Sequence, residues 1–322
     1  MIIGIDGGGT KTTGIAVDDY GKVLGLATVG PTNPNSADEL AIKKELSTLF
    51  AELLSTSKLG KEDIVFAGIS GAESGGKKEW FQQILEELLG NAPKIMIDND
   101  AITALYSETK GEAGIVCISG TGSIAFGINE ELKRARVGGW GYLINDGYSG
   151  FTVGKRLLEY VFTSFDEGKD SCELSDEVLA HFQVGSVTEL IPVVYELGKT
   201  RDRVASVARI VVDKANTGDK VCTSIMENAA EVLLKDIKLL FHRLTDSKKE
   251  MVSQFPIVLT GGIIKHSSVL ISYLQQKVTE ESLPFKFSLA TGEPVLGTVY
   301  GGLKFADREI TGEFIENLER KK

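Results

Sequence analysis

Short apolar blocks alternate with polar turns along the chain and predict strands and helices in a regular order. The first block, Ile2–Ile5, has the length of a buried strand, and a second, Gly14–Val17, follows it after a glycine-rich turn. A third strand-like run, Val23–Val29, comes after the turn at Asp18–Gly21. Three sequential strands joined by tight turns predict an antiparallel meander at the start of the fold.

Helices and further strands follow this meander. Apolar positions near helical spacing predict helices over about 37–55 and 77–89, and apolar runs predict buried strands at Ile64–Ile69 and Ile95–Ile97. The second of these strands ends in Asp98-Asn99-Asp100 and runs into another helix. This alternation predicts an α/β domain with a mixed sheet.

The same succession then starts again. A strand at 114–118, the turn Ser119–Ser123 and a strand at 124–128 repeat the strand, glycine turn and strand of the first hairpin, which indicates a weak internal duplication. We therefore predict two α/β domains. The first is 1–112, completed by a C-terminal helix near 307–320, and the second is 113–306, with a helical insertion at about 173–245.

Composition narrows the class of protein. The 322 residues are 42% hydrophobic and 25% charged, and the formal net charge of −10 argues against a nucleic-acid-binding surface. No apolar run approaches the roughly 20 residues that span a bilayer, and the first residues do not resemble a secretory signal. Cys117, Cys172 and Cys222 are far apart, as is typical of reduced thiols. We expect a cytoplasmic protein that binds neither nucleic acid nor membrane.

The turn of the first hairpin has the residue types that bind phosphate. Its glycines let backbone N–H groups converge on an anion, and its Thr and Lys side chains add donors. The residues expected to contact phosphate are Gly7, Gly8, Gly9, Thr10, Lys11 and Thr12. Asp6 would repel phosphate unless a divalent cation lay between them, so we expect Asp6 to hold Mg²⁺ through water. In the alternative, Asp6 caps a turn and Lys11 points to solvent.

Three glycine turns in order, Asp6–Thr10, Ser119–Ser123 and Thr260–Gly262, resemble the actin-like, sugar-kinase and heat-shock-chaperone ATPase superfamily. The resemblance covers nearly the whole chain and implies two duplicated actin-like (ribonuclease H-like) domains around a hinged cleft that holds ATP and Mg²⁺. Finer motifs are similar to the BadF/BadG-type ATPase family, and most of all to its N-acetylglucosamine kinase branch. These motifs are Gly30-Pro31-Thr32-Asn33, Asn99-Asp100-Ala101, Ile118–Ser123 and Gly138-Gly139-Trp140-Gly141.

The resemblance implies a kinase that transfers the γ-phosphate of ATP to a hydroxyl of an N-acetylated amino sugar, such as N-acetylglucosamine or N-acetylmuramate. We expect the 6-hydroxyl to be the acceptor. The other expected nucleotide ligands are Ser119, Gly120, Thr121, Gly122, Gly261 and Gly262. The expected sugar ligands are Asn33, Ser70, Gly71, Asp100, Thr121, Gly122, Gly139, Trp140 and Asp146. Dimers are common in the family, so the resemblance also allows a homodimer.

Asp100 is the predicted catalytic base, because it follows a buried strand and begins a helix at the strand ends. General-base catalysis is typically worth about 10²–10⁴-fold in rate. Two alternatives remain: Asp100 caps the helix, or Asp98 is the base. Asn33 could likewise only cap a turn, Trp140 could be a core aromatic, and Gly261 and Gly262 could serve only a strand-to-helix turn.

One segment departs from the family pattern. Asn145-Asp146-Gly147-Tyr148-Ser149 stands where the family has Gly-Asp-Glu-Gly-Ser. Since Tyr148 adds bulk and a hydroxyl, we expect it to reshape the sugar pocket. Two other functions stay open at this point. One is an ATP-driven activator of a 2-hydroxyacyl-CoA dehydratase, which needs cysteines for a [4Fe–4S] cluster at a dimer interface, and the other is a non-catalytic sugar sensor.

Overall fold

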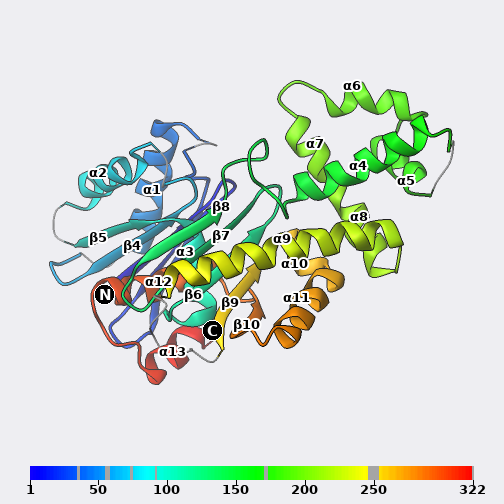
Figure 1. The fold of residues 1–322 in the computed structure, drawn as a ribbon. Coiled ribbons are helices and arrows are strands. Elements are labelled where there is room, and N and C mark those ends of the chain that lie inside the picture. The colour runs from blue at the N-terminus through cyan, green and yellow to red at the C-terminus, as the bar shows by residue number, and fades with distance from the viewer. Residues whose placement is uncertain are drawn as a thin grey trace. The chain divides into compact units, whose positions relative to one another are not determined.

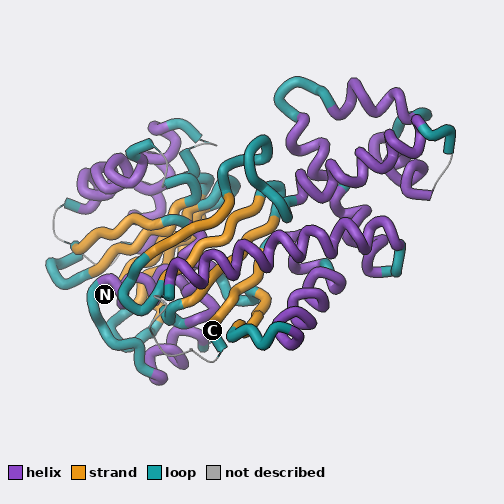
Figure 2. Tube along the Cα trace, in the orientation of Figure 1, coloured by secondary structure: helices purple, strands orange, loops and turns teal. Residues whose placement is uncertain are grey.

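Two five-stranded sheets, one in each of two units, carry the fold (Figures 1 and 2). The computed structural model describes residues 1–34, 37–54, 59–72, 75–90, 93–169, 173–245 and 254–320. Unit 1 comprises Met1–Gly114 and Ala290–Lys322, and unit 2 comprises Ile115–Leu289. Cys172, one of the three expected thiols, lies outside the described residues.

The sheet of unit 1 has the order β3-β2-β1-β4-β5. Its strands are β1 (Ile2–Gly7), β2 (Thr12–Val17), β3 (Val23–Val29), β4 (Ile64–Ile69) and β5 (Lys94–Asp98). β1, β2 and β3 pair antiparallel, as the meander predicted, whereas β1, β4 and β5 pair parallel. The carboxyl ends of three parallel strands therefore meet at one edge of the sheet, where ligand sites of α/β sheets usually lie.

Helices cover both faces of this sheet. α1 (Glu39–Leu53) and α2 (Lys77–Leu89) share a buried core with Ile3, Ile5 and Val65, while α3 (Asp100–Thr109) and α12 (Pro294–Phe305) lie against β1 and β4. α1 begins later than predicted because Asp38 caps it by accepting from the Ala41 N–H.

α12 belongs to unit 1, which differs from the predicted boundary that placed it in the second domain. Its glycines explain the close packing. A Cβ on Gly297 would overlap the Thr103 carbonyl oxygen, and one on Gly301 would stand 2.7 Å from the Phe66 ring. Non-local contacts of this kind decide which domain the helix joins, and a local pattern does not reveal them.

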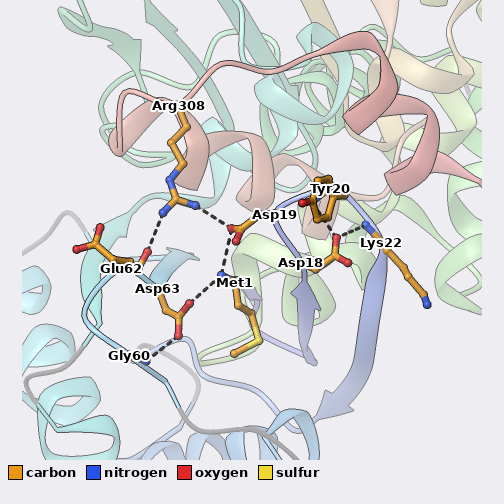
Figure 3. A network of polar contacts seen from close by, with 9 residues as sticks. All are labelled: Met1, Asp18, Asp19, Tyr20, Lys22, Gly60, Glu62, Asp63 and Arg308. Atoms are coloured by element: carbon orange, nitrogen blue, oxygen red, sulfur yellow. Dashed lines mark hydrogen bonds and ion pairs between the residues drawn. The ribbon is translucent and has the colours of Figure 1, made fainter.

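The C-terminal segment is also tied to unit 1 (Figure 3). Arg308 donates to Asp19 at 3.0 Å and to the Glu62 carbonyl at 2.8 Å, and the Met1 ammonium contacts Asp19 and Asp63 at 3.2 and 2.7 Å. Burial alone would raise the pKa of Asp19, but hydrogen bonds and charge from the ammonium and from Arg308 outweigh it and lower that pKa. Helix α13 (Gly312–Glu319) completes the segment.

Unit 2 repeats the strand arrangement of unit 1. Its sheet has the order β10-β9-β6-β7-β8, so in each unit the first three strands are neighbours in sequence order. The fourth strand pairs with the free edge of the first, and the fifth pairs with the fourth. The strands are β6 (Gly114–Ser119), β7 (Ser123–Ile128), β8 (Arg134–Gly138), β9 (Phe255–Thr260) and β10 (Phe285–Leu289). β9 pairs parallel with both β6 and β10. The predicted duplication is therefore visible in the topology.

Most of the helix content of unit 2 lies between β8 and β9. The helices there are α4 (Gly150–Asp166), α5 (Glu173–Phe182), the 3₁₀ turn η1 (Val187–Glu189), α6 (Leu190–Val194), α7 (Thr200–Ser206), α8 (Ala208–Asn216) and α9 (Lys220–Leu244). α9 packs on β7 and β8 and continues to α8 and α11 (Ser268–Glu280), with the short α10 (Gly262–His266) after β9 (Figure 1). No helix in the described ranges combines the length and apolar character needed to cross a membrane.

Candidate functional site

The tip of the first hairpin presents its predicted phosphate residues to solvent. The Gly8 N–H donates to the Lys11 carbonyl at 3.0 Å and closes the turn. Gly9, Thr10 and Lys11 are exposed. The charge of Lys11 lies close enough to Asp6 to oppose the rise that burial causes in the Asp6 pKa. An anion placed at the tip would therefore meet both Thr10 and Lys11.

Thr12 does not share this exposure. It is fully buried at the start of β2, and its Oγ1 lies 2.8 Å from Thr32 Oγ1. The hydroxyl links the hairpin to the loop that carries Asn33, so the structure does not support its expected place among the phosphate ligands. Thr12 begins β2 with its side chain turned inward, whereas Lys11 lies in the turn before the strand and is exposed.

The expected sugar residues of unit 1 lie beside this hairpin. The N–H groups of Thr32 and Asn33 both donate to the Gly8 carbonyl at 3.2 Å. On the neighbouring strand, the Ser70 N–H donates to the Gly7 carbonyl at 2.8 Å, and Gly71 follows with φ +81°. The loop with Asn33, the end of β4 and the phosphate-type turn thus form one edge.

Asp6 and Asp100 face each other across this edge. Thr103 Oγ1, on α3, donates to Asp6 Oδ1 at 3.2 Å and lies 2.8 Å from the Asp100 carbonyl oxygen. The pKa of Asp6 is raised to about 6, and burial is the largest cause. Repulsion from Asp100 raises this pKa further, whereas the Thr103 hydrogen bond and the charge of Lys11 lower it. The carboxylates of Asp6 on β1 and Asp100 at the start of α3 are therefore close enough to repel.

The structure bears on both alternatives to Asp100 as the base, namely that Asp100 caps the helix or that Asp98 is the base. The cap of α3 is Asn99, whose Oδ1 accepts from the Ile102 N–H at 3.0 Å, and Asp100 is the first helical residue. Asp98 is fully buried; its Oδ1 accepts from the Asn99 N–H at 2.9 Å and lies 3.9 Å from Lys78 Nζ. Asp100 is partly exposed, so it is the more accessible of the two carboxylates.

The pair Asp6 and Asp100 fits a divalent cation better than it fits bare phosphate. Their mutual repulsion and the raised pKa of Asp6 are what a bound cation would relieve. Within the described part of the chain, no three His, Cys, Asp or Glu side chains gather as a metal-binding group. Mg²⁺ does not require such a cage, since it keeps several waters and is often held by one or two carboxylates together with substrate phosphates.

The second hairpin is fixed from the inside by Asp146. Its Oδ1 accepts from the Ser123 hydroxyl at 2.7 Å and from the Ser123 N–H, and it is only 6% exposed. The Oδ2 atom is buried without a hydrogen-bond partner and lies beside Gly122. Ser119 is fully buried and donates to the Tyr148 carbonyl at 2.5 Å, whereas Thr121 at the tip is exposed. Of this hairpin's predicted ligands, Thr121 and the turn backbone face outward.

A cavity of about 720 Å³ opens at this turn, within the range of small-molecule sites. Its lining includes Gly120 and Thr121, the start of α4 at Gly150, helices α7 and α8, and Gly262 at the start of α10. Gly261 has φ +95°, and a Cβ there would overlap the Ser119 carbonyl oxygen. Gly261 and Gly262 thus form the strand-to-helix turn, and Gly262 also lines the cavity.

The glycine-rich loop after β8 leaves Trp140 exposed. The Trp140 side chain is 57% accessible, and the Arg136 guanidinium carbon lies 3.9 Å from the centre of its ring. Gly139 has φ +69°, and a Cβ there would stand 2.7 Å from Ile124. Trp140 is thus not a core aromatic, which was the alternative to a sugar-binding role.

The expectation for Tyr148 is not supported. Its side chain is 1% exposed and belongs to the hydrophobic core of unit 2, so it fills the core rather than the sugar pocket. Gly147 has a related role, because a Cβ there would stand 2.5 Å from Val232 Cγ1 on α9. The packing of α9 explains the glycine at position 147, and the hydrophobic core of unit 2 contains the Tyr148 ring.

Sequence reasoning missed the side chains that line the cavity from α7, α8 and α10. The polar ones are Asp202, Ser206, Arg209, Asp213, Asn216 and His266. They come from short helices in a region read only as helical, and no motif marks them. Thr103 was missed for a similar reason, since its contact with Asp6 joins residues 97 positions apart.

Comparison with known proteins places these features in a family. The family model described as the BadF/BadG/BcrA/BcrD ATPase family matches residues 3–297. A relative from Clostridium acetobutylicum named N-acetylmuramic acid/N-acetylglucosamine kinase is 34% identical over 84% of this chain and 87% of its own length. An N-acetyl-D-glucosamine kinase from Dictyostelium discoideum is 32% identical over 92% of this chain and 96% of its own.

The solved structures agree on the fold. A Chromobacterium violaceum protein proposed to be an N-acetylglucosamine kinase superposes with a TM-score of 0.65 at 22% identity, covering 92% of this chain and 97% of that one. The predicted α/β fold, with two related five-stranded sheets, is confirmed by this likeness and by the topology of the two units.

Proposed function

Because the chain belongs to the BadF/BadG/BcrA/BcrD ATPase family, we propose that it is an ATP-dependent kinase of an N-acetylated amino sugar. N-acetylglucosamine and N-acetylmuramate are the substrates named for the relative of highest identity given above. The observation that carries the proposal is the carboxylate pair Asp6 and Asp100, which adjoins both a phosphate-type turn and the Asn33 loop. A kinase needs these three features together: a base, a nucleotide contact and a sugar contact.

In the proposed reaction, a sugar hydroxyl attacks the γ-phosphorus of ATP and the bond from that phosphorus to the β,γ-bridging oxygen breaks. ADP leaves with the electron pair, and Asp100 accepts the proton of the attacking hydroxyl. The partly exposed Asp100 is held at the first turn of α3, with its own carbonyl tied to Thr103. Asn33 offers a donor and an acceptor to a sugar hydroxyl from the adjoining loop.

We propose that Asp6 holds Mg²⁺ through water, with Asp100 close by. When bound, this ion would neutralise the phosphate charge that develops as the bond breaks. Thr10 and Lys11 would contact phosphate oxygens at the tip of the first hairpin, and both are exposed there. In unit 2, Thr121 and the backbone of Gly120 and Gly122 would contact phosphates at the mouth of the cavity, while Gly262 would leave room for the nucleoside.

For the sugar, we propose that Trp140 offers a ring face and that Asp146 contributes its buried Oδ2. The exposure of Trp140 supports the first assignment, and the lack of a hydrogen-bond partner at Oδ2 supports the second. We further propose a cytoplasmic location. We also propose a homodimer, which gel filtration would test. The dehydratase-activator alternative is not favoured, since Cys117 and Cys222 are both buried and no surface thiol exists among the described residues.

The test is ADP release with glucose, glucosamine, N-acetylglucosamine, N-acetylmannosamine and N-acetylmuramate as acceptors. We expect turnover with the N-acetylated sugars, dependence on added Mg²⁺, and a loss of about 10²–10⁴-fold in kcat for Asp100→Asn. Asp166→Asn, an exposed aspartate at the end of α4, is the matched control and should keep full activity. Turnover with none of the sugars, or an Asp100→Asn variant as active as the wild type, would contradict the proposal.

A further inference from the structure

The guanidinium of Arg201 lies against the turn of the second hairpin. A Cβ built on Gly122 would stand 2.9 Å from Arg201 Nη2 and 3.5 Å from Asp146 Oδ2. A side chain on Gly122 would therefore displace the guanidinium from this position. Arg201 lies on α7, far from the hairpin in sequence, so the glycine-turn motif at Ser119–Ser123 does not indicate its presence.

One aromatic ring lies within cation–π distance of the arginine. The Arg201 guanidinium carbon lies 5.9 Å from the centre of the Tyr142 ring, and that ring packs on Phe151 at 4.7 Å between centres. Phe151 in turn donates its N–H to the Thr121 carbonyl at 3.2 Å. The arginine and the turn are thus connected through one short chain of contacts.

The charge of Arg201 is not neutralised by a neighbouring acid. Two other cations near the start of α7, Lys199 and Arg203, both pair with Glu196, at 2.5 and 3.0 Å. Arg201 is exposed and forms no ion pair with any carboxylate among the described residues. Asp146, which also borders Gly122, accepts from Ser123 through its Oδ1. A positive charge is therefore available at the turn.

The two hairpins differ in this respect. The first has its own cation, Lys11, whereas the turn Ser119–Ser123 has only Ser, Thr and Gly. The cavity starts at this turn, and Asp202, the residue after Arg201, is part of its lining. We propose that Arg201 supplies the missing cation and binds the terminal phosphates of the nucleotide at the turn Gly120–Gly122. The planar guanidinium can form two parallel hydrogen bonds to one phosphoryl group, which a lysine cannot.

The inference rests on the proposed function only in requiring that the cavity holds a nucleotide, and it predicts an effect that depends on the number of phosphates. Calorimetric titration of Arg201→Gln with AMP, ADP and ATP should show AMP affinity within twofold of wild type and ATP affinity weakened about 10- to 100-fold, the range for a charge-assisted hydrogen bond. Arg201→Lys should recover part of the loss. Lys199→Gln removes one charge nearby and should leave ATP affinity unchanged.

Two results would overturn the inference. Equal losses for AMP, ADP and ATP would show that Arg201 shapes the cavity, and unchanged ATP affinity would show that it contacts no phosphate. If Arg201→Gln melts well below the wild type, Arg201→Lys with the same three nucleotides decides the matter. The sugar panel separates the two proposals. A wild type that phosphorylates no sugar, yet loses ATP affinity in Arg201→Gln, would refute the kinase and retain the phosphate contact.

Discussion

Replacement of Tyr148 by Phe should stabilise unit 2 and leave sugar selectivity unchanged. The Tyr148 hydroxyl is buried in the core and has no hydrogen-bond partner, and burial, with the nearby Cys117, Asp236 and Asp146, raises its pKa well above the usual value. A buried hydroxyl without a partner costs about 1–3 kcal/mol relative to one in water. Removing it should regain about 1 kcal/mol after the loss of its packing contacts.

Differential scanning fluorimetry of the wild type and Tyr148→Phe measures this effect. For a unit of this size, about 1 kcal/mol corresponds to a Tm change of roughly 2–4 °C, so the variant should melt higher by that amount. KM for the sugar should stay within twofold of the wild type. A Tm lowered by 2 °C would mean that the hydroxyl has a partner, and a several-fold change in sugar KM would mean that Tyr148 reaches the pocket. Either result would refute the assignment of Tyr148 to the core.

Gly147 and Val232 provide a matched test of the same packing. Gly147→Ala would place a Cβ 2.5 Å from Val232 Cγ1, and overpacking of this kind typically costs about 1–3 kcal/mol. In a Val232→Ala background that cost should largely disappear, because the colliding methyl group is gone. A double-mutant cycle would show the coupling directly, and additive effects would contradict it.

Two other predictions concern unit 1. Thr103→Val removes the hydroxyl that donates to Asp6. Activity at limiting Mg²⁺ should therefore fall several-fold and recover at saturating Mg²⁺. A loss of activity that no Mg²⁺ concentration restores would argue against a role for Asp6 in holding the metal. Arg308→Gln removes one of the charges that lower the pKa of Asp19. Above about pH 4 the variant should therefore be less stable than the wild type, by less than about 1 kcal/mol for so exposed an ion pair. This difference should vanish at lower pH, where Asp19 becomes protonated. Thermal melts between pH 3 and 7 test this, and a difference that grows toward acid would contradict it.

Features set by short stretches of sequence were predictable. The hairpin at Gly7–Thr12 and the start of α3 at Asp100 follow from local apolar runs and glycine turns, and both are present. The sequence offered Asp100 as a cap of α3, but the cap is Asn99, whose side chain accepts from the Ile102 N–H. The repeated strand order was visible as two similar hairpins, since each hairpin depends only on its own residues.

Features set by contacts between distant segments were not predictable. Arg201 reaches the second hairpin from α7, and α12 joins unit 1 through Gly297 and Gly301. Neither position carries a motif, and a basic residue on a short helix reads as an ordinary surface charge. Tyr148 was misplaced for the opposite reason. A departure from a family motif suggested a change in the ligand pocket, whereas the Tyr148 side chain is buried in the hydrophobic core of unit 2.

The shared acceptor at Gly8 links the nucleotide and sugar contacts that we propose for unit 1. One carbonyl oxygen receives the N–H groups of both Thr32 and Asn33, so a nucleotide that shifts the hairpin tip also moves the loop proposed to hold the sugar. Linkage requires such an influence to be reciprocal: whatever factor ATP adds to sugar affinity, the sugar must add to ATP affinity. Where that factor exceeds one, the enzyme without sugar binds ATP more weakly than the enzyme with sugar, which limits the hydrolysis of ATP by water.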